Sequence, residues 1–274
     1  MNRRSILMAP LIVPLVTLAA PAVRAAGESG DGARWAEIRR ELFGDRPIEP
    51  AGDRLVLEAP GRAEDAAVVP VSFTATAPRR SPDGVRSVHL IIDNNPAPLA
   101  AVFRFPPDGA DPAVATRIRI NEYTPLRAVA ETADGRLIMA ERFVKASGGC
   151  SAPAGKDQVA ALARLGRMRL NGADAAAPGR PATLQVLISH PNNSGLQFDQ
   201  ISRTYVPPHY LTTIAIAHAG RPLLAVDADI SLSEDPSIHF TFVPDGPGPL
   251  TVRAEDTKGG VFDGAWPVAG APGG

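Results

Sequence analysis

Apolar and polar residues alternate in many short segments of the chain, and these segments predict β-strands. Residues 116–121 read Thr-Arg-Ile-Arg-Ile-Asn, a strict alternation that is typical of a half-buried antiparallel strand. The segment Ala133-Asp134-Gly135-Arg136 separates two such stretches and indicates a hairpin turn. In the first half, the pattern predicts strands at residues 55–57, 69–76, 88–92, 99–105, 115–120, 126–131 and 137–144.

The second half of the chain shows the same pattern of short segments with alternating apolar and polar residues. The pattern predicts strands at residues 168–170, 182–189, 211–218, 230, 238–243, 250–255 and 261–268. Turn-forming glycine and proline separate them, for example at residues 244–246. Strands and helices do not alternate regularly, which argues against an α/β enzyme fold. We therefore predict an all-β protein of two immunoglobulin-like β-sandwich domains, since many short strands with turns between them are typical of that architecture.

Helical periodicity occurs at only two places. Residues 33–43 place Trp35, Ile38 and Leu42 on one face and charged residues on the other, which predicts a short amphipathic helix. Gly44 is expected to end it. A second short helix is predicted at about residues 157–165, ended by Gly166.

The first residues have the character of an export signal. Arg3 and Arg4 precede an apolar stretch over residues 9–20, and small residues follow up to Ala26. This order predicts a secretory signal peptide over residues 1–26 and a mature protein in the periplasm. The Arg3-Arg4 pair fits a twin-arginine signal, and an ordinary Sec signal with two adjacent arginines stays equally open.

Composition narrows the classes of function. The chain has 28 Lys and Arg against 29 Asp and Glu, so it lacks the basic excess expected of a dedicated nucleic-acid binder. A single cysteine excludes an internal disulfide and a cysteine-based zinc finger. None of the five histidines has the spacing of a known metal motif, and we interpret them as structural residues of strands and turns. The sequence thus predicts no metal, no cofactor and no catalytic residue.

The single cysteine lies in a linker between the two predicted domains. Residues 145–156 are rich in glycine, proline and small residues, a composition typical of a flexible linker. Gly148 and Gly149 precede Cys150 and are expected to give this arm its flexibility. No bulky residue stands beside Cys150, so its thiol is expected to be exposed. An exposed, unpaired thiol is a liability in an oxidising compartment, and its presence there indicates a function.

A mobile arm suits a carrier better than a catalyst. Nucleophilic catalysis by cysteine requires a histidine held within hydrogen-bond reach of the thiol, and a flexible arm does not hold that geometry by itself. A carrier instead needs reach, so that a group bound to Cys150 enters the pocket of another protein. Two alternatives stay open: an incidental linker cysteine, and a cysteine hydrolase whose fold brings a histidine next to Cys150.

Several segments of the sequence resemble two families that act together. Gly148-Gly149-Cys150 resembles the Gly-Gly-Cys-Gly-Gly swinging arm of SoxY, the sulfur-carrier protein of thiosulfate oxidation. Further likeness to SoxY lies, in order, in Val88-His89-Leu90, Asn95-Pro96, Ala101-Val102-Phe103-Arg104-Phe105, Thr116-Arg117-Ile118-Arg119 and Ala128-Val129-Ala130-Glu131. In the second half, Leu187-Ile188-Ser189-His190-Pro191 with Ser194-Gly195 resembles the hallmark stretch of SoxZ, its partner subunit.

This order is similar to that of the fused SoxYZ-like carriers associated with quinoprotein dehydrogenases. The resemblance implies two immunoglobulin-like domains, a SoxY-like one over residues 33–144 and a SoxZ-like one over residues 167–270, which pair within one chain. It also implies that Cys150, on the arm and short helix of residues 145–166, covalently holds a sulfur-containing or related intermediate. The implied partners are periplasmic enzymes of sulfur oxidation or a quinoprotein dehydrogenase, with neither nucleic acid nor membrane bound by the mature form.

Two departures from the SoxY pattern affect this interpretation. The arm of SoxY is a free C-terminus, whereas here a second domain follows, so the arm is tethered at both ends. Ser151-Ala152 also replaces the final Gly-Gly, so that a partner pocket that admits only glycine beside the cysteine would not accept this arm. The alternative function is a non-catalytic accessory or docking module of a periplasmic dehydrogenase, in which Cys150 is dispensable.

Overall fold

The computed structural model describes residues 28–153, 158–200 and 202–268. The predicted signal peptide of residues 1–26 lies outside them. Within the described part of the chain, no helix is long and apolar enough to cross a bilayer. The α-helices are α1 (Glu28–Phe43) and α2 (Gln158–Leu162), and two 3-10 turns occur at Gly52–Arg54 and Ala173–Ala175.

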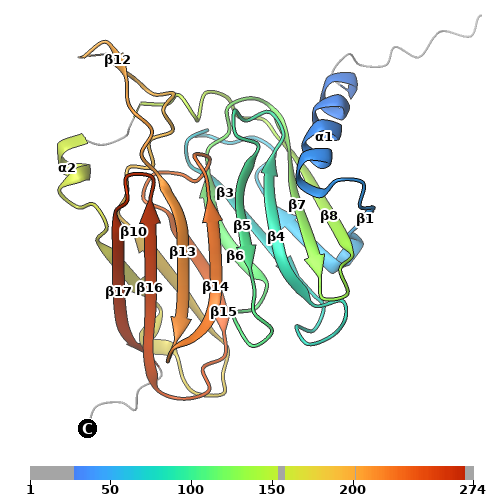
Figure 1. Cartoon of the computed structure of the whole chain (residues 1–274), viewed down its shortest axis with the longest axis vertical. Helices are drawn as coiled ribbons and strands as arrows, with labels where there is room; N and C mark the ends of the chain where they lie inside the picture. The colour runs from blue at the N-terminus through green and yellow to red at the C-terminus, as the bar shows by residue number, and fades with distance from the viewer. Residues whose placement is uncertain (1–27, 154–157, 201, 269–274) are drawn as a thin grey trace, which may run out of the picture.

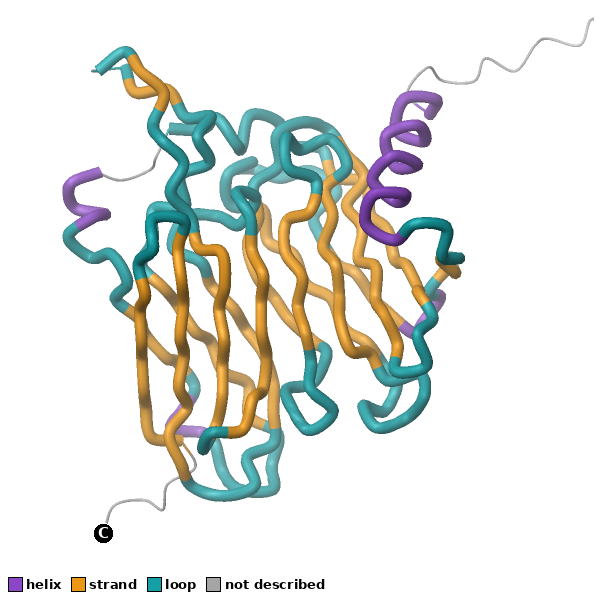
Figure 2. The backbone as a smooth tube through the Cα atoms, viewed as in Figure 1, coloured by secondary structure: helices purple, strands orange, loops and turns teal. Residues whose placement is uncertain are grey.

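Strands make up most of the remaining structure (Figures 1 and 2). They are β1 (Ile48–Pro50), β2 (Leu55–Glu58), β3 (Val69–Ala75), β4 (Val85–Ile92), β5 (Leu99–Arg104), β6 (Ala113–Ile118), β7 (Thr124–Thr132), β8 (Leu137–Val144), β9 (Met168–Asn171), β10 (Ala182–Ile188), β11 (Phe198–Asp199), β12 (Thr204–Tyr205), β13 (Leu211–His218), β14 (Arg221–Ala228), β15 (Ser237–Phe242), β16 (Gly248–Asp256) and β17 (Val261–Val268). The all-β prediction is confirmed.

Two large sheets run through both halves of the chain. One has nine strands in the order β1-β8-β7-β4-β5-β14-β13-β16-β17, and the other has six in the order β2-β3-β6-β15-β10-β9. Each half therefore contributes strands to both sheets and is a two-layered sandwich. Figure 1 shows β11 and β12 projecting from one end of the molecule.

The two halves are joined edge to edge. Strand β14 of the second half pairs antiparallel with β5 of the first half, with Val226 opposite Phe103. In the other sheet, Phe240 of β15 lies opposite Val114 of β6. One hydrophobic core cluster contains buried residues of both halves, including Phe103, Phe240 and Phe242. This pairing covers strand edges that a lone sandwich would expose, so the halves share their sheets instead of touching only through a linker.

Local sequence signals missed some of the elements. The local pattern predicts only Ile230 near the position of β14 (Arg221–Ala228), a strand that contains Pro222 and Asp227, residues that are unusual in a strand interior. Pro222 is accommodated at its position opposite Ala217, next to an irregularity in the register of β13 and β14. Helix α1 begins earlier than the predicted residue 33, and α2 is shorter than the predicted 157–165.

Helix α1 packs on the outer face of the nine-stranded sheet. Ile38 and Phe43 form a second, smaller core cluster with Ile91, Val129 and Leu137. The helix thereby covers the sheet where β4, β7 and β8 lie side by side (Figure 1). The amphipathic pattern predicted for residues 33–43 has its physical reason in this contact.

Candidate functional site

The segment that contains Cys150 is tied to the body of the first half. The amide of Gly148 donates a hydrogen bond to the carbonyl of Asn121 (2.8 Å), and the amide of Gly149 donates one to the carbonyl of Ile120 (2.9 Å). These acceptors lie directly after β6. Upstream, Lys145 forms a parallel bridge with Arg62. The arm is thus held by the same kind of backbone bonds that hold a strand.

The two glycines have separate structural reasons. Gly148 adopts a φ of +83°, which favours glycine over residues with a side chain. A Cβ added at Gly149 would lie 2.0 Å from the carbonyl oxygen of Ala66 and 2.7 Å from that of Ile120, so that no larger residue fits there. The prediction assigned both glycines to the flexibility of the arm. In the structure, one permits a turn and the other a close backbone approach.

The thiol of Cys150 is fully buried, with 0% of the residue exposed. The expectation of an exposed thiol on a loose arm is therefore wrong for this state of the protein. The reason is tertiary: although its sequence neighbours are small, backbone from Ala66 and Ile120 covers the adjacent Gly149. Burial raises the pKa of the Cys150 thiol to about 11, which the positive charge of Arg119 partly offsets.

A loop of the second half holds the arm from the other side. The Ser194 hydroxyl donates a hydrogen bond to the carbonyl oxygen of Cys150 (2.5 Å). Ser194 is itself positioned by Gln197, whose side-chain oxygen accepts its amide (3.0 Å). The two segments that the sequence singled out, Gly148-Gly149-Cys150 and residues 187–195, therefore meet in the fold. The arm is fixed at the junction of the two halves.

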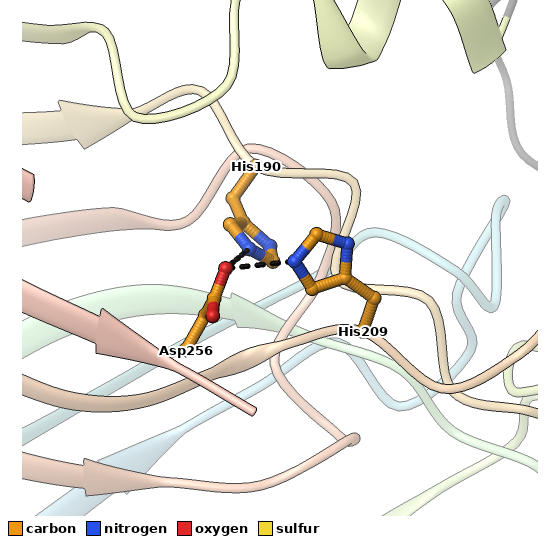
Figure 3. A group of neighbouring side chains, drawn as sticks. All are labelled: His190, His209 and Asp256. Carbon is orange, nitrogen blue, oxygen red and sulfur yellow. Dashed lines mark hydrogen bonds and ion pairs between the residues drawn. The ribbon is translucent and has the colours of Figure 1, made fainter. Parts of the chain in front are cut away.

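Three buried residues at the base of this loop form a carboxylate–imidazole cluster (Figure 3). Nε2 of His209 lies 2.7 Å and Nε2 of His190 lies 3.3 Å from Oδ2 of Asp256. Oδ1 of Asp256 accepts the amides of Lys258 and Gly260, both at 2.8 Å. Burial alone would raise the pKa of Asp256, but these hydrogen bonds lower it to about 2.

The hydrogen bonds of the cluster favour a structural clamp over a metal site. The three potential ligand atoms lie within 4.8 Å of one another, which is compatible with a metal ion in distance alone. However, Nδ1 of His190 accepts the amide of Asn192 (3.1 Å), so the proton of the neutral ring lies on Nε2 and points at Asp256. A histidine that binds a metal through Nε2 usually donates from its other nitrogen. The cluster instead anchors the loop that carries Ser194.

Sequence reasoning identified none of this cluster as a unit. His190, His209 and Asp256 come from separate parts of the second half, and no local spacing connects them. The interpretation of the histidines as structural residues of strands and turns is compatible with the hydrogen bonds of His190 to Asn192 and Asp256. Among the described residues, Cys150 makes no hydrogen bond to a histidine, and the charge that acts on its thiol is that of Arg119.

We expect the stability of the protein to fall as the pH drops below the ordinary histidine pKa. Burial lowers the pKa of His190 from its ordinary value of 6.5, so the unfolded chain binds this proton more readily than the folded one. The neutral ring then stabilises the fold above pH 6.5, and the contribution is lost as the pH falls below it. His89 and His239, whose pKa values burial also lowers, add to the loss.

Thermal unfolding at about pH 7.5 and about pH 5.5 tests this expectation. The melting temperature should fall between the two, and a His190→Gln variant should show a smaller fall because it lacks one of the titrating rings. A melting temperature that is the same at both pH values would contradict it.

Both halves of this chain are similar to known protein families. The family profile described as "Sulfur oxidation protein SoxY" matches residues 39–150, and that described as "Sulphur oxidation protein SoxZ" matches residues 168–267. The search of curated proteins returned no match. Among solved structures, the sulfur carrier protein SoxY from Chlorobium limicola f thiosulfatophilum is 25% identical, over 43% of this chain and 96% of its own, with a TM-score of 0.37.

Two other solved structures show weaker likeness. A β-glycosidase from Bacteroides vulgatus is 10% identical over 83% of this chain and 25% of its own, with a TM-score of 0.24. A tetra-tandem repeat from the extending region of a large adhesion protein is 16% identical over 78% of this chain and 48% of its own, with a TM-score of 0.26. The two family matches together span most of the chain, which contains a SoxY domain and a SoxZ domain in that order and belongs to the SoxY–SoxZ sulfur-oxidation family as a fused protein.

Proposed function

We propose that this protein is a non-enzymatic carrier that holds a sulfur-containing or related intermediate covalently on Cys150. One observation carries the proposal: the SoxY match ends at Cys150, the only cysteine of the chain, and a loop of the SoxZ domain binds that residue through Ser194. A thiolate is the form of cysteine that attacks an electrophilic sulfur. The carrier thus needs a state in which the thiol is both accessible and ionised.

The position of the arm in this structure corresponds to a retracted state under this proposal. With its thiol fully buried and its pKa raised to about 11, Cys150 is protected from oxidation and unreactive at neutral pH. Loading then requires that the hydrogen bonds of Gly148, Gly149 and Ser194 open. A flexible segment of a dozen residues spans about 20 Å between its ends, so an arm tethered at both ends bulges outward by a limited distance.

We expect a Ser194→Ala variant to expose Cys150 more often. Loss of the hydroxyl leaves the buried carbonyl of Cys150 without its side-chain donor, which costs about 1–2 kcal/mol and corresponds to roughly 5–30-fold more frequent opening. The rate at which iodoacetamide alkylates Cys150 at neutral pH measures this opening. Ser202→Ala is the matched control, because Ser202 is an exposed serine of the same half. Equal alkylation rates for Ser194→Ala and the control would contradict the role of the Ser194 hydrogen bond in holding the arm.

The finer parts of the proposal concern place and partners. We infer a periplasmic location from the signal-like sequence of residues 1–26. The inferred partners are enzymes that load Cys150 or act on the bound group, of the sulfur-oxidation type or a quinoprotein dehydrogenase. Pairing of the two domains within one chain takes the place of a separate SoxZ subunit, which is supported by the shared sheets.

A second candidate function is an accessory or docking module in which Cys150 is dispensable. The full burial of the thiol and its raised pKa favour this candidate, because structural cysteines have these properties. Replacement of the gene in its host by a Cys150→Ser version separates the two. If the protein is a carrier, the host should stop oxidising its reduced sulfur compound although the variant protein stays folded and abundant. If it is a docking module, that oxidation should continue undiminished.

A further inference from the structure

A cavity of about 450 Å³ lies beside the retracted arm. Its lining includes Ala152 and Pro153 of the arm together with Arg117, Arg119, Glu234 and Asp235. Arg119 is the residue among these whose charge acts on Cys150. The cavity therefore borders the arm directly after Ser151, and one of its lining residues, Arg119, carries the positive charge that acts on the thiol.

Arg119 is buried with only 3% of its surface exposed, and its hydrogen bonding is incomplete. Both side-chain hydrogen bonds that it makes within the described residues come from Nη1, to the carbonyls of Asn192 (2.5 Å) and Leu232 (3.1 Å). Its Nε is buried and has no acceptor there. Neutral carbonyls do not balance a charge, and the carboxylate that acts on Arg119 electrostatically, that of Glu234, makes no hydrogen bond to its Nε. The neutral thiol of Cys150 supplies no further negative charge.

The other charges of the cavity limit what fits beside Arg119. Glu234 acts on Arg119 electrostatically, and Asp65 and Asp235 also line the cavity. These carboxylates repel a large anion that fills the cavity. A short anionic group attached to Cys150 would instead find a donor in the Nε edge of Arg119, which has no acceptor among the described residues. A guanidinium binds oxyanions through such an edge by charge-assisted hydrogen bonds.

We propose that Arg119 binds the anionic end of a small group attached to the sulfur of Cys150, and so holds the loaded arm in the retracted position more firmly than the empty arm. The proposal rests on the proposed carrier function, since it needs a group on Cys150. It makes Arg119 a positioning residue that distinguishes a loaded arm from an empty one. A loaded arm would then leave its site only when a partner competes for the anion or for the arm.

Methanethiosulfonate reagents provide matched adducts for a test. The Cys150 thiolate attacks the sulfur that bears the variable group, a disulfide forms, and methanesulfinate leaves with the electron pair of the broken S–S bond, while the thiol proton goes to solvent. The sulfonatoethyl, methyl and trimethylammonioethyl reagents give anionic, neutral and cationic adducts on the same atom. Loading in mild denaturant, followed by dilution and intact-mass analysis, gives each adduct on the full mature chain.

The rate at which a phosphine reductant removes each adduct, divided by the rate for the same adduct on the unfolded chain, reports how firmly the arm is retracted. We expect the anionic adduct to be removed about 10-fold more slowly than the neutral one, and the cationic adduct to be removed fastest. Arg119→Gln should abolish this order and Arg119→Lys should restore part of it. Arg117→Gln is the matched control, since Arg117 lines the same cavity, and it should keep the order.

Equal normalised rates for the three adducts in the wild-type protein would overturn the proposal, whether or not the Arg119 variants fold. An order that persists unchanged in Arg119→Gln would also overturn it, because the charge would then act from elsewhere. Since the adducts are made chemically, the outcome is independent of whether Cys150 carries a group in the cell. The Cys150→Ser replacement in the host therefore tests the carrier function separately.

Discussion

Replacement of Gly149 by alanine is expected to displace the arm and make Cys150 reactive. The added methyl group would lie 2.0 Å from the carbonyl oxygen of Ala66 and 2.7 Å from that of Ile120. Both contacts are with backbone, which cannot rotate out of the way as a side chain can. We expect a loss of about 1–3 kcal/mol in the free energy of unfolding or, where the arm leaves its site instead, a rise in the alkylation rate of Cys150 to that of an exposed thiol.

Gly148→Ala is the control for this variant. Gly148 lies next to Gly149 in the same arm, but an added Cβ there would meet no atom within 4 Å. The loss in the free energy of unfolding is therefore limited to the strain of a φ of +83°, about 1 kcal/mol. Urea unfolding and thiol alkylation, measured on both variants, separate steric displacement from strain. A Gly149→Ala protein with the stability and thiol reactivity of the wild type would show that the arm is not seated as described.

The second large effect is expected from Asp256→Ala, which removes the centre of the buried clamp. Two imidazole N–H groups and two backbone amides donate to this carboxylate. Their loss in a buried site is expected to lower the free energy of unfolding by about 3–5 kcal/mol. Because the clamp anchors the loop that carries Ser194, the alkylation rate of Cys150 should rise as well.

Asp256→Asn should cost less than the alanine variant. Its amide oxygen can accept the amides of Lys258 and Gly260, while its NH₂ group faces the two imidazoles. His209 can adopt the other tautomer, but His190 cannot, because its Nδ1 already accepts the amide of Asn192. Asp263→Asn is the control, since Asp263 forms an exposed pair with Arg253 and should change stability by no more than about 1 kcal/mol. Equal losses for Asp256→Ala and Asp263→Asn would refute the clamp.

The strands could be predicted where their burial is visible in the local pattern. In β16 and β10, buried and solvent-facing residues alternate along the strand, and the sequence shows the same alternation. Strand β14 lacked this signal, because its identity depends on pairing with β5 and β13 on either side. The joining of both halves into shared sheets was not visible for the same reason: it is a property of strand edges, not of strand composition.

The sequence singles out Cys150 for the candidate site, but the environment of this residue could not be predicted. The single cysteine after two glycines pointed to Cys150 directly. Ala66 and Ile120 cover the adjacent Gly149 and Ser194 binds the Cys150 carbonyl; all three are remote in sequence, so a composition of small neighbours wrongly suggested exposure. The cluster of His190, His209 and Asp256 is likewise assembled only by the fold. Local sequence singles out Cys150 as the residue of the proposed attachment, whereas its burial depends on the fold.

The intact mass of the protein isolated from its native host without reductant, measured before and after reduction, tests the central claim most directly. The carrier account predicts a fraction with a reducible adduct on Cys150 that is missing from a Cys150→Ser protein, and the mass of the adduct identifies the group carried. Only an unmodified thiol, or only a disulfide-linked dimer, would contradict the account and favour a docking module in which Cys150 is dispensable.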